Sequence, residues 1–297
     1  MENWFAVALL SPALFALVTL ADDNLVRKVY KSPEFGAIVS GFFALIPLLL
    51  LPFYPIALPP IPIMLLAMLA GFLTINYYLL YFKALLVESP SIVITLFQMS
   101  RAIVPFLAYI FLGELLSKGE YAGFLMIFTA AVGISAIDIK KFRFSKAFPL
   151  IVVAASITAV IAILDKTVYK QVQFWDGYIF FCVGMGLGAF VLTRVTTEGR
   201  KFYGQFFSKF KSFIILFLLT ELLNIGAEMS LGYAISQGPV SLVKVIEGIQ
   251  PFFVLFFAIL LYPFLPQYFR EAAEKNLTRK ILFMMLMLLG LYIISAY

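Results

Sequence analysis

The sequence contains no histidine and only one cysteine, Cys182, among its 297 residues. The commonest metal ligand and the commonest general base of enzymes are therefore missing. A lone cysteine inside an apolar run also excludes a disulfide framework and a thiolate metal site. Because neither a nucleophile–base pair nor a metal cluster can be assembled, we predict no metal, no cofactor and no enzymatic activity.

Charge is scarce as well. Charged residues make up 13% of the chain and hydrophobic residues 63%, and the mean hydropathy is +1.02. In soluble domains about a quarter of the residues are charged, so the composition predicts a polytopic membrane protein whose partner is the lipid bilayer. The net charge of +6 comes from basic residues between apolar runs. That distribution is typical of membrane-flanking charges and does not indicate nucleic-acid binding.

Apolar runs long enough to cross a bilayer recur along the whole chain. A spanning helix needs about 20 mostly apolar residues, about twice the length of a spanning strand, so we predict an all-α fold. The N-terminal run lacks the basic region and cleavage site of a signal peptide and is expected to be the first span. Ten transmembrane helices are predicted, at residues 4–21, 36–52, 61–82, 90–112, 121–138, 147–164, 177–193, 211–235, 239–262 and 280–296.

The loops between these spans carry unequal charge on the two sides of the membrane. Three basic residues fall on one side, Lys118, Lys166 and Lys170. Seventeen fall on the other side, in the segments 27–31, 83, 140–146, 194–211 and 270–280. Because basic loops stay in the cytoplasm, the sequence predicts a multi-pass protein of the plasma (inner) membrane with both termini outside.

The second half of the chain repeats the first. The stretch "FKALLVESPSIVITLFQMSRAIVPF" (82–106) matches "YAISQGPVSLVKVIEGIQPFFVLF" (233–256), and "LADDNLVRKVY" (20–30) matches "ILDKTVYKQV" (163–172). Five spans per repeat is an odd number, so the two copies must insert with opposite orientation. We predict two inverted five-helix repeats, 1–139 and 147–297, joined by a basic linker at 140–146. Inverted repeats build transporters with a substrate site near the bilayer midplane.

Short motifs in both halves resemble a known family. They are "ALLVESPS" and "AISQGPVS" at the start of the fourth and ninth spans, "LGE" at 112–114, and "YAGFLMIFTAAVGISAI" in the fifth span. The chain resembles the drug/metabolite transporter superfamily, in particular its ten-span EamA-like family. The resemblance implies a transporter with spans 1–4 and 6–9 around the site and spans 5 and 10 peripheral, available for a homodimer contact. Two features depart from the family: Pro263 stands at the position that matches Glu114, and family members usually keep their termini in the cytoplasm.

Polar residues recur at matching positions of the fourth and ninth spans. A charged side chain near the middle of a membrane helix costs about 2.5–3.5 kcal/mol even on a lenient scale, so such residues tend to face a partner or a water-filled cavity. A spacing of three keeps each set on one side of its helix. An offset of 149 residues relates Thr95, Gln98 and Arg101 to Lys244, Glu247 and Gln250. We predict that these six residues line a substrate site, with Asn76 and Tyr78 of the third span as hydrogen-bonding walls.

The eighth span adds Glu221, Asn224 and Glu228 on one helix face, as candidates for coupling or ion pairing. Lys244 is expected to pair with Glu228 or Glu247. Because two cations within the spans face three carboxylates, either one carboxylate holds a proton, which would allow proton coupling, or a cationic ligand supplies the missing charge. Glu228 or Glu247 would then bind a proton or a substrate amine, and Arg101 or Lys244 a carboxylate or phosphate. The alternative is that these groups only pair with one another to hold helices together.

Two lesser predictions concern packing and helix ends. Gly184 and Gly188 have the spacing of a close helix–helix contact. Asp22, Asp23 and Asp165 lie at predicted span ends, where we expect interfacial caps or ion-pair partners.

The predicted function is a secondary transporter that moves a small metabolite, amino-acid-like or otherwise amphoteric, by alternating access. One alternative is a carrier of phosphorylated or lipid-linked phosphate substrates that uses Arg101 and Lys244 as an anion clamp. A second alternative, from another class, is a structural or receptor-like membrane protein without flux.

Overall fold

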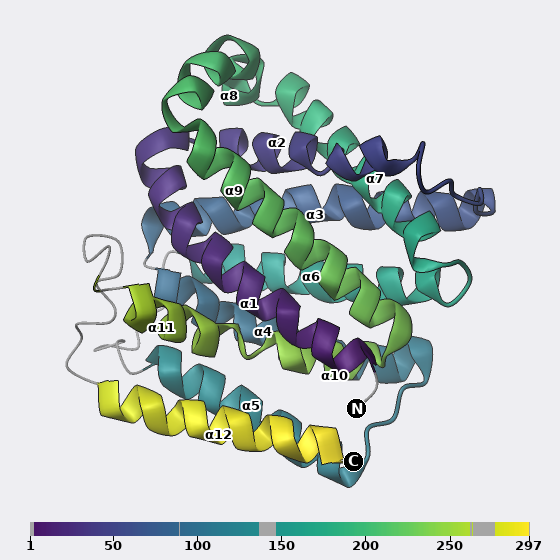
Figure 1. Cartoon of the computed structure of the whole chain (residues 1–297), viewed down its shortest axis with the longest axis vertical. Helices are drawn as coiled ribbons and strands as arrows, with labels where there is room; N and C mark the ends of the chain where they lie inside the picture. Colours follow the sequence, from purple (N-terminus) through teal and green to yellow (C-terminus); the bar gives the residue numbers. More distant parts are fainter. Residues whose placement is uncertain (1–2, 89, 137–146, 262, 264–276, 297) are drawn as a thin grey trace.

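The computed structural model describes residues 3–88, 90–136, 147–261, 263 and 277–296. Within these ranges the chain is helical and contains no strand, so the all-α prediction is confirmed for the described residues. The predicted linker at 140–146 lies outside them. Figure 1 shows the helices side by side in one bundle, in which α1 begins and α12 ends at the same end of the molecule.

The helices of the first half lie at the predicted spans, and the first and third of them extend beyond their predicted ends. The first helix runs past its predicted end into a π-helix, and the second is followed by a short 3-10 helix. The elements are α1 (Asn3–Asn24), η1 (Leu25–Tyr30), α2 (Pro33–Phe43), η2 (Ile46–Leu50), α3 (Ile61–Val87), α4 (Pro90–Leu112) and α5 (Lys118–Ala136).

The second half contains two more helical segments than predicted, because one short helix precedes α9 and the ninth span is divided. The elements are α6 (Phe148–Tyr169), α7 (Phe174–Val195), α8 (Thr197–Arg200), α9 (Phe202–Gln237), α10 (Val240–Glu247), α11 (Gln250–Leu261) and α12 (Leu277–Ala296). Each of the ten predicted ranges is thus helical over most of its described residues.

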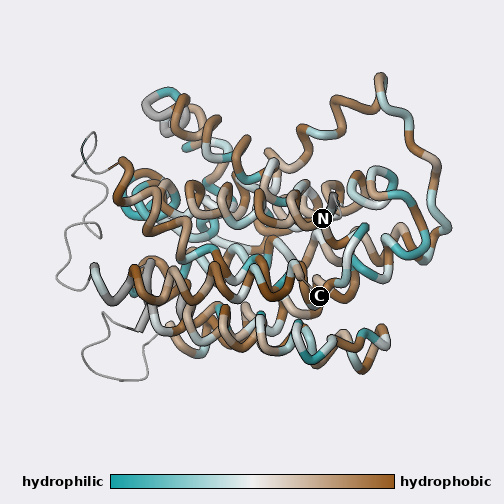
Figure 2. Tube along the Cα trace, turned by 60° about the horizontal axis from the view of Figure 1, so that its bottom comes forward, coloured by the Kyte–Doolittle hydropathy of each residue, from teal (hydrophilic) through white to brown (hydrophobic). Residues whose placement is uncertain are grey.

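Several helical segments are long and apolar enough to cross a membrane. Among the described residues there are seven of them by length and composition: 4–30, 33–50, 61–87, 148–169, 174–195, 214–237 and 240–261. The apolar helices at 96–112 and 281–296 are shorter. Apolar residues dominate the helices along the whole trace (Figure 2). The structure therefore supports a multi-pass membrane protein, while the count of ten crossings stays a prediction.

The predicted span at 239–262 is present as one membrane-length segment, 240–261, but it is not one continuous helix. The helix ends at Glu247, and α11 begins at Gln250 after a tight turn in which the Gly248 and Ile249 N–H groups bond to Val245 O (2.9 Å) and Ile246 O (3.0 Å). Pro251 contributes to this break, because it has no N–H to donate to the carbonyl of Glu247 four residues earlier.

Two helices begin where side chains satisfy their free backbone N–H groups. Ser32 caps α2 by accepting from the Phe35 N–H (3.1 Å), and Pro33 occupies the first helical position. Before α5, the Glu120 carboxylate accepts from the Ser117 N–H (2.6 Å), and Ser117 Oγ accepts from the Glu120 N–H (3.2 Å). This reciprocal pair is a capping box, and it fixes the start of α5.

Close backbone contact between α3 and α7 organises the middle of the bundle. A side chain at Gly184 of α7 would collide with the backbone of Met68, and one at Gly71 of α3 with the backbone of Phe181. Gly188 packs against Ile75. The predicted role of Gly184 and Gly188 in close helix packing is therefore confirmed.

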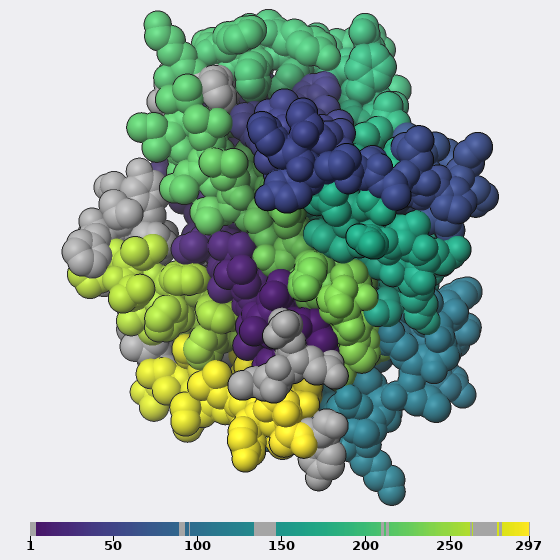
Figure 3. Space-filling model, turned by 45° about the vertical axis from the view of Figure 1, so that its right-hand side comes forward, coloured from purple at the N-terminus to yellow at the C-terminus, as the bar shows by residue number. Residues whose placement is uncertain are grey.

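The remaining helices pack in pairs around this centre. α1 lies along α9 and also contacts α11, and α6 lies along α3 and α4. Figure 3 shows the purple residues of α1 between the green of α9 and the yellow-green of α11. α5 and α12 pack on each other at one edge of the bundle (Figure 1).

Candidate functional site

A cavity of about 80 Å³ lies among helices of both halves. Its walls come from α1, α2, α3 and α4 of the first half and from α6, α9, α10 and α11 of the second. The structure brings most of the predicted site residues to this cavity: Tyr78, Arg101, Glu221, Asn224, Glu228, Lys244, Glu247 and Gln250.

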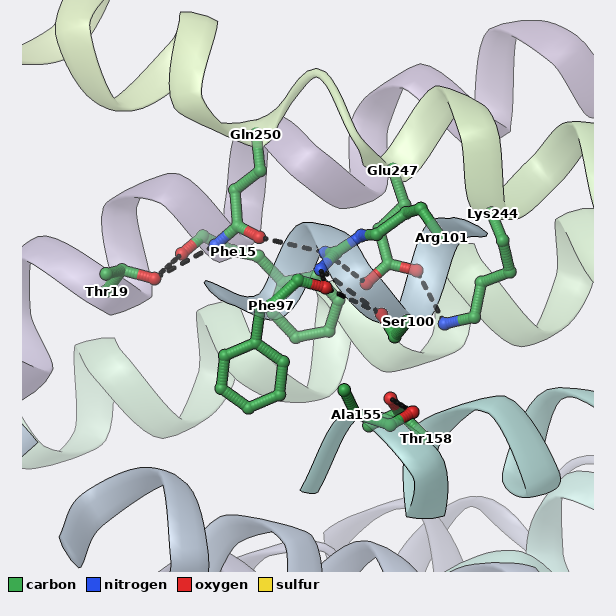
Figure 4. A network of polar contacts seen from close by, with 10 residues as sticks. All are labelled: Phe15, Thr19, Phe97, Ser100, Arg101, Ala155, Thr158, Lys244, Glu247 and Gln250. Atoms are coloured by element: carbon green, nitrogen blue, oxygen red, sulfur yellow. Dashed lines mark hydrogen bonds and ion pairs between the residues drawn. The ribbon is translucent and has the colours of Figure 1, made fainter. Parts of the chain in front are cut away.

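A buried carboxylate with two cations stands at one wall. Arg101 Nη2 on α4 lies 3.1 Å from Glu247 Oε1, and Lys244 Nζ donates to Glu247 Oε2 (Figure 4). The exposed fractions of these side chains are 8% for Arg101, 10% for Lys244 and 12% for Glu247. The expected Glu247–Lys244 pair is therefore present. The alternative Glu228–Lys244 pair is absent from the ion pairs of the described residues.

Arg101 also connects the ion pair to α1. Its Nη1 donates to the Phe97 carbonyl (2.9 Å), and its Nη2 reaches Gln250 Oε1 at 3.5 Å. Gln250 Nε2 in turn donates to Thr19 Oγ1 on α1 (3.0 Å), as Figure 4 shows. Arg101 and Gln250 are the residues that the offset of 149 relates to each other, so matching positions of the two halves meet at this point.

A second polar group lies between α3 and α9. Tyr78 Oη donates to Glu228 Oε1 (2.7 Å) and lies 3.2 Å from Asn224 Oδ1. The ring of Tyr77 contacts Phe97 edge to face, with centroids 5.5 Å apart. The third helix therefore supplies both hydrogen bonds and aromatic surface, as predicted for Tyr78.

Three predicted residues do not contribute described side chains to the cavity. Asn76 donates to the Phe72 carbonyl of its own helix (2.9 Å) and does not line the cavity. Gln98 is 1% exposed and lies beside Gly248, and its amide has no hydrogen-bond partner among the described residues. It sits on the flank of α4 that faces α10, whereas Arg101 faces the cavity. The side chain of Thr95 lies outside the described part of the chain.

Asp22 and Asp165 correct the sequence interpretation of span-end caps. Both line the cavity, and they are only 6% and 9% exposed. They lie inside the bundle because α1 continues into η1 and α6 continues to Tyr169. The signal in the sequence was that apolar residues continue after Asp22, which indicates that this span extends further. The third residue, Asp23, does form an ion pair, with Arg27 at 2.7 Å.

Basic side chains close the C-terminal ends of two matching helices. Arg27 Nη2 donates to Leu85 O (2.6 Å) and Glu88 O (2.9 Å) at the end of α3. Lys166 Nζ donates to Ile235 O (2.8 Å) and Gly238 O (2.7 Å) at the end of α9. Free carbonyls at a helix C-terminus attract cations. In the alignment of 82–106 with 233–256, Leu85 matches Ile235 and Glu88 matches Gly238, so the accepting carbonyls of the two helices are at matching positions.

Glu114 caps the N-terminus of a helix, in contrast to the C-terminal caps by Arg27 and Lys166. Its carboxylate accepts from the Val240 N–H (3.0 Å), the Ser241 N–H (3.1 Å) and Ser241 Oγ (2.9 Å), at the N-terminus of α10. An acid at this place complements the positive end of the helix dipole. In the second half the matching position is Pro263, which cannot do the same for α4.

Comparison with known proteins relates the first half of the chain to a transporter family. Residues 3–136, a little under half of the chain, match the model of the EamA-like transporter family. None of the curated proteins matches the sequence. A solved structure titled only "Crystal structure of protein" superimposes with a TM-score of 0.69 at 16% identity, over 99% of this chain and 95% of its own. At that identity the likeness concerns the fold alone, and it extends over both halves.

Proposed function

We propose that this chain is a secondary transporter that moves a small amphoteric solute across the plasma membrane by alternating access. The observation that carries the proposal is the cavity itself. It lies among membrane-type helices of both halves and holds buried side chains of both charge signs beside a broken helix. Buried charges in a membrane protein are costly and tend to mark substrate and ion pathways.

The paired contacts of the helices support an inverted repeat. If spans 1–5 exchange with spans 6–10, the α1–α9 contact exchanges with the α6–α3 contact, and α4–α6 with α11–α1. All of these contacts are present. The carbonyls of α3 that Arg27 caps and those of α9 that Lys166 caps are matching positions, which fits the same exchange. Such pseudo-symmetry lets a transporter open to either side around one site.

The break between α10 and α11 lies at the ion pair. The carbonyl of Glu247 has no N–H at position 251 to bond to, because that residue is proline. Discontinuous helices of this kind form substrate and ion sites in transporters, since their unpaired backbone groups and dipole ends point into the cavity. The position of the break therefore favours a binding site over a purely structural ion pair.

The charges favour an amphoteric solute over a phosphorylated one. An anion clamp needs free cations, but Arg101 and Lys244 both contact Glu247. Further carboxylates, Glu228 and Asp165, line the same cavity and could receive an amine. A volume of about 80 Å³ in this conformation suits a small solute. The solute's amine would then replace one cation at a carboxylate, while its own carboxylate takes the cation released.

The peripheral helices fit a homodimer contact. α5 and α12 form one edge of the bundle, and their outer faces carry exposed apolar side chains such as Leu125, Leu282, Met285 and Tyr292. Such faces contact lipid or another membrane protein, so the proposal includes dimerisation through α5 and α12.

The proposal also places both termini outside the cell, because the basic loops would then lie in the cytoplasm. Single cysteines near each terminus, in a Cys182→Ser background, would report the orientation by reaction with a membrane-impermeant maleimide.

Counterflow in proteoliposomes tests the function. Vesicles loaded with an unlabelled amino-acid mixture are diluted into the same mixture carrying label, and we expect protein-dependent entry of label. Sugar phosphates tested in the same way should give no entry, and entry of those alone would favour the phosphate carrier. Absence of exchange with either pool would contradict transport of these solutes and favour the structural alternative.

A further inference from the structure

A second acidic group lines the cavity away from the ion pair. Asp22 on α1, Ser40 on α2, and Thr220 and Glu221 on α9 all line the cavity. They are buried, with exposed fractions of 6%, 5%, 2% and 3% in that order. We refer to these four residues as the Asp22–Glu221 site.

The polar atoms of the Asp22–Glu221 site are unequally satisfied. Glu221 accepts from Ser40 Oγ (3.0 Å) and is also hydrogen-bonded to Asn224. Thr220 Oγ1 has no hydrogen-bond partner among the described residues. No described side chain donates to Asp22 or forms an ion pair with it, although this carboxylate is 94% buried and faces the cavity. Leaving a buried carboxylate unpaired is costly, so the site is incomplete as it stands.

Asp22 and Glu221 line the same cavity from two helices that pack on each other, α1 and α9, so their negative charges repel. Every other titratable group that faces them is an acid: Asp23 on α1, Tyr30 on η1 and, on α3, Tyr77 and Tyr81. Lys244 attracts Glu228 and Asp165, whereas no cation of the described residues forms an ion pair with Asp22 or Glu221. Two neighbouring buried carboxylates cannot both stay ionised, and they need one positive charge between them.

We propose that the Asp22–Glu221 site holds one exchangeable proton and couples its movement to transport. The inference rests on the proposed function, and it places coupling away from Glu247, which already has two cations. A proton is the ligand that fits. No group of three or more metal-ligating side chains exists among the described residues. Ser40 donates to Glu221 and so stabilises the charged form of that carboxylate, which leaves the unpaired Asp22 as the better place for the proton.

The position of the pair gives the proton a structural effect. Asp22 and Glu221 stand on α1 and α9, which pack along each other for most of their length. Water on one face supplies the proton to a carboxylate oxygen, and water on the other face accepts it when the O–H bond breaks. Without the proton the two carboxylates repel, which favours separation of α1 from α9. Protonation therefore biases the conformations between which the cavity alternates.

Asp22→Asn and Glu221→Gln test the coupling, with Asp23→Asn as the matched control. Asp23 is the next residue on the same helix, but it pairs with Arg27 and does not line the cavity. The probe is the labelled amino-acid mixture, measured first as exchange at equal pH and then as accumulation driven by a pH gradient. One pH unit supports at most about tenfold accumulation per coupled proton. We expect both site variants to keep exchange but lose this accumulation, and Asp23→Asn to keep both.

The outcomes separate this inference from the proposed function. If the wild type does not exchange label at all, the proposed function fails first. If it exchanges but the variants still accumulate with the gradient, or if the folded variants lose exchange itself, the coupling role of the pair is wrong.

A measurement without substrate decides whether the proton is present. Infrared spectra of the purified protein at neutral pH should contain the carbonyl stretch of a protonated carboxylic acid, which shifts in D₂O. We expect this band to weaken in Asp22→Asn and in Glu221→Gln, because either change removes the repulsion that retains the proton. An undiminished band in both variants would overturn the proton site whatever the transport assays show.

Discussion

α4 and the α10–α11 pair occupy matching places in the two halves, yet they differ in continuity and charge. α4 is one helix of 23 residues that passes through Pro105 without interruption, and it contributes Arg101 to the cavity. Its counterpart breaks at Gly248 and Ile249, and it contributes Lys244, Glu247 and Gln250. The second half therefore supplies most of the charge of the site and also its helix break.

The difference extends to the helix ends. Glu114 caps the N-terminus of α10, while the matching residue for α4 is Pro263, which has no carboxylate. The end of the bundle near α10 is thus held by a carboxylate contact for which Pro263 offers no equivalent. In a transporter built from two matching halves, a cap present on only one of them can stabilise one of the two alternating conformations relative to the other.

The largest effect is expected from the ion pair that joins the two helices. Glu247→Gln leaves two buried cations without their carboxylate, and breaking a buried pair costs about 3–5 kcal/mol. Adding Arg101→Met removes one of these cations, so the double variant should be more stable than the sum of the single variants predicts, by at least about 1 kcal/mol. Unfolding by sodium dodecyl sulfate in mixed micelles measures the cycle. Additive losses would show that α4 and α10 are not coupled at this point.

A smaller effect is expected from the prolines, and it has opposite signs for stability and activity. Pro251→Ala restores an N–H for the Glu247 carbonyl, which should stabilise a continuous helix by up to about 3 kcal/mol and slow exchange about tenfold. Pro105→Ala is the matched control, because α4 is already continuous. Its exchange rate should stay within about twofold of the wild type. Equal slowing in both variants would show that the break in the ninth span has no special role.

The smallest effect is expected at the unmatched cap. Glu114→Ala removes three acceptor contacts at the N-terminus of α10 and should lower the free energy of unfolding by about 1–2 kcal/mol. Glu198→Ala serves as control, because its pair with Lys201 is exposed and is expected to contribute less than about 0.5 kcal/mol. If the two variants unfold alike, Glu114 does not hold the two halves together.

Helix positions were predictable from the sequence because each apolar run is long and distinct. Helix ends were less predictable. The π-helix at Leu25–Tyr30 continues the first span beyond Asp22, whose charge suggested an end. The break after Glu247 follows from Pro251, but Pro105 in α4 produces none, so a proline alone does not decide continuity.

The site was predictable where matching positions of the two halves carried polar residues. Arg101, Lys244, Glu247 and Gln250 lie together as that pattern indicated. Gln98 shares the pattern but faces α10, because a spacing of three drifts around a helix with 3.6 residues per turn. Asp165 was missed because its position near a span end favoured a cap.

The most direct test of whether the ion-pair cavity is the transport site is the exchange rate of three variants. They are Glu247→Gln, the double variant Glu247→Gln with Arg101→Met, and Glu198→Gln. Counterflow of the labelled amino-acid mixture is measured across a range of pH, with rates expressed per folded protein. We predict that Glu198→Gln exchanges like the wild type, while both Glu247 variants lose exchange by about 100-fold or more at every pH, consistent with the loss of at least about 2.7 kcal/mol of stabilisation. Wild-type rates in Glu247→Gln and in the double variant would contradict the account.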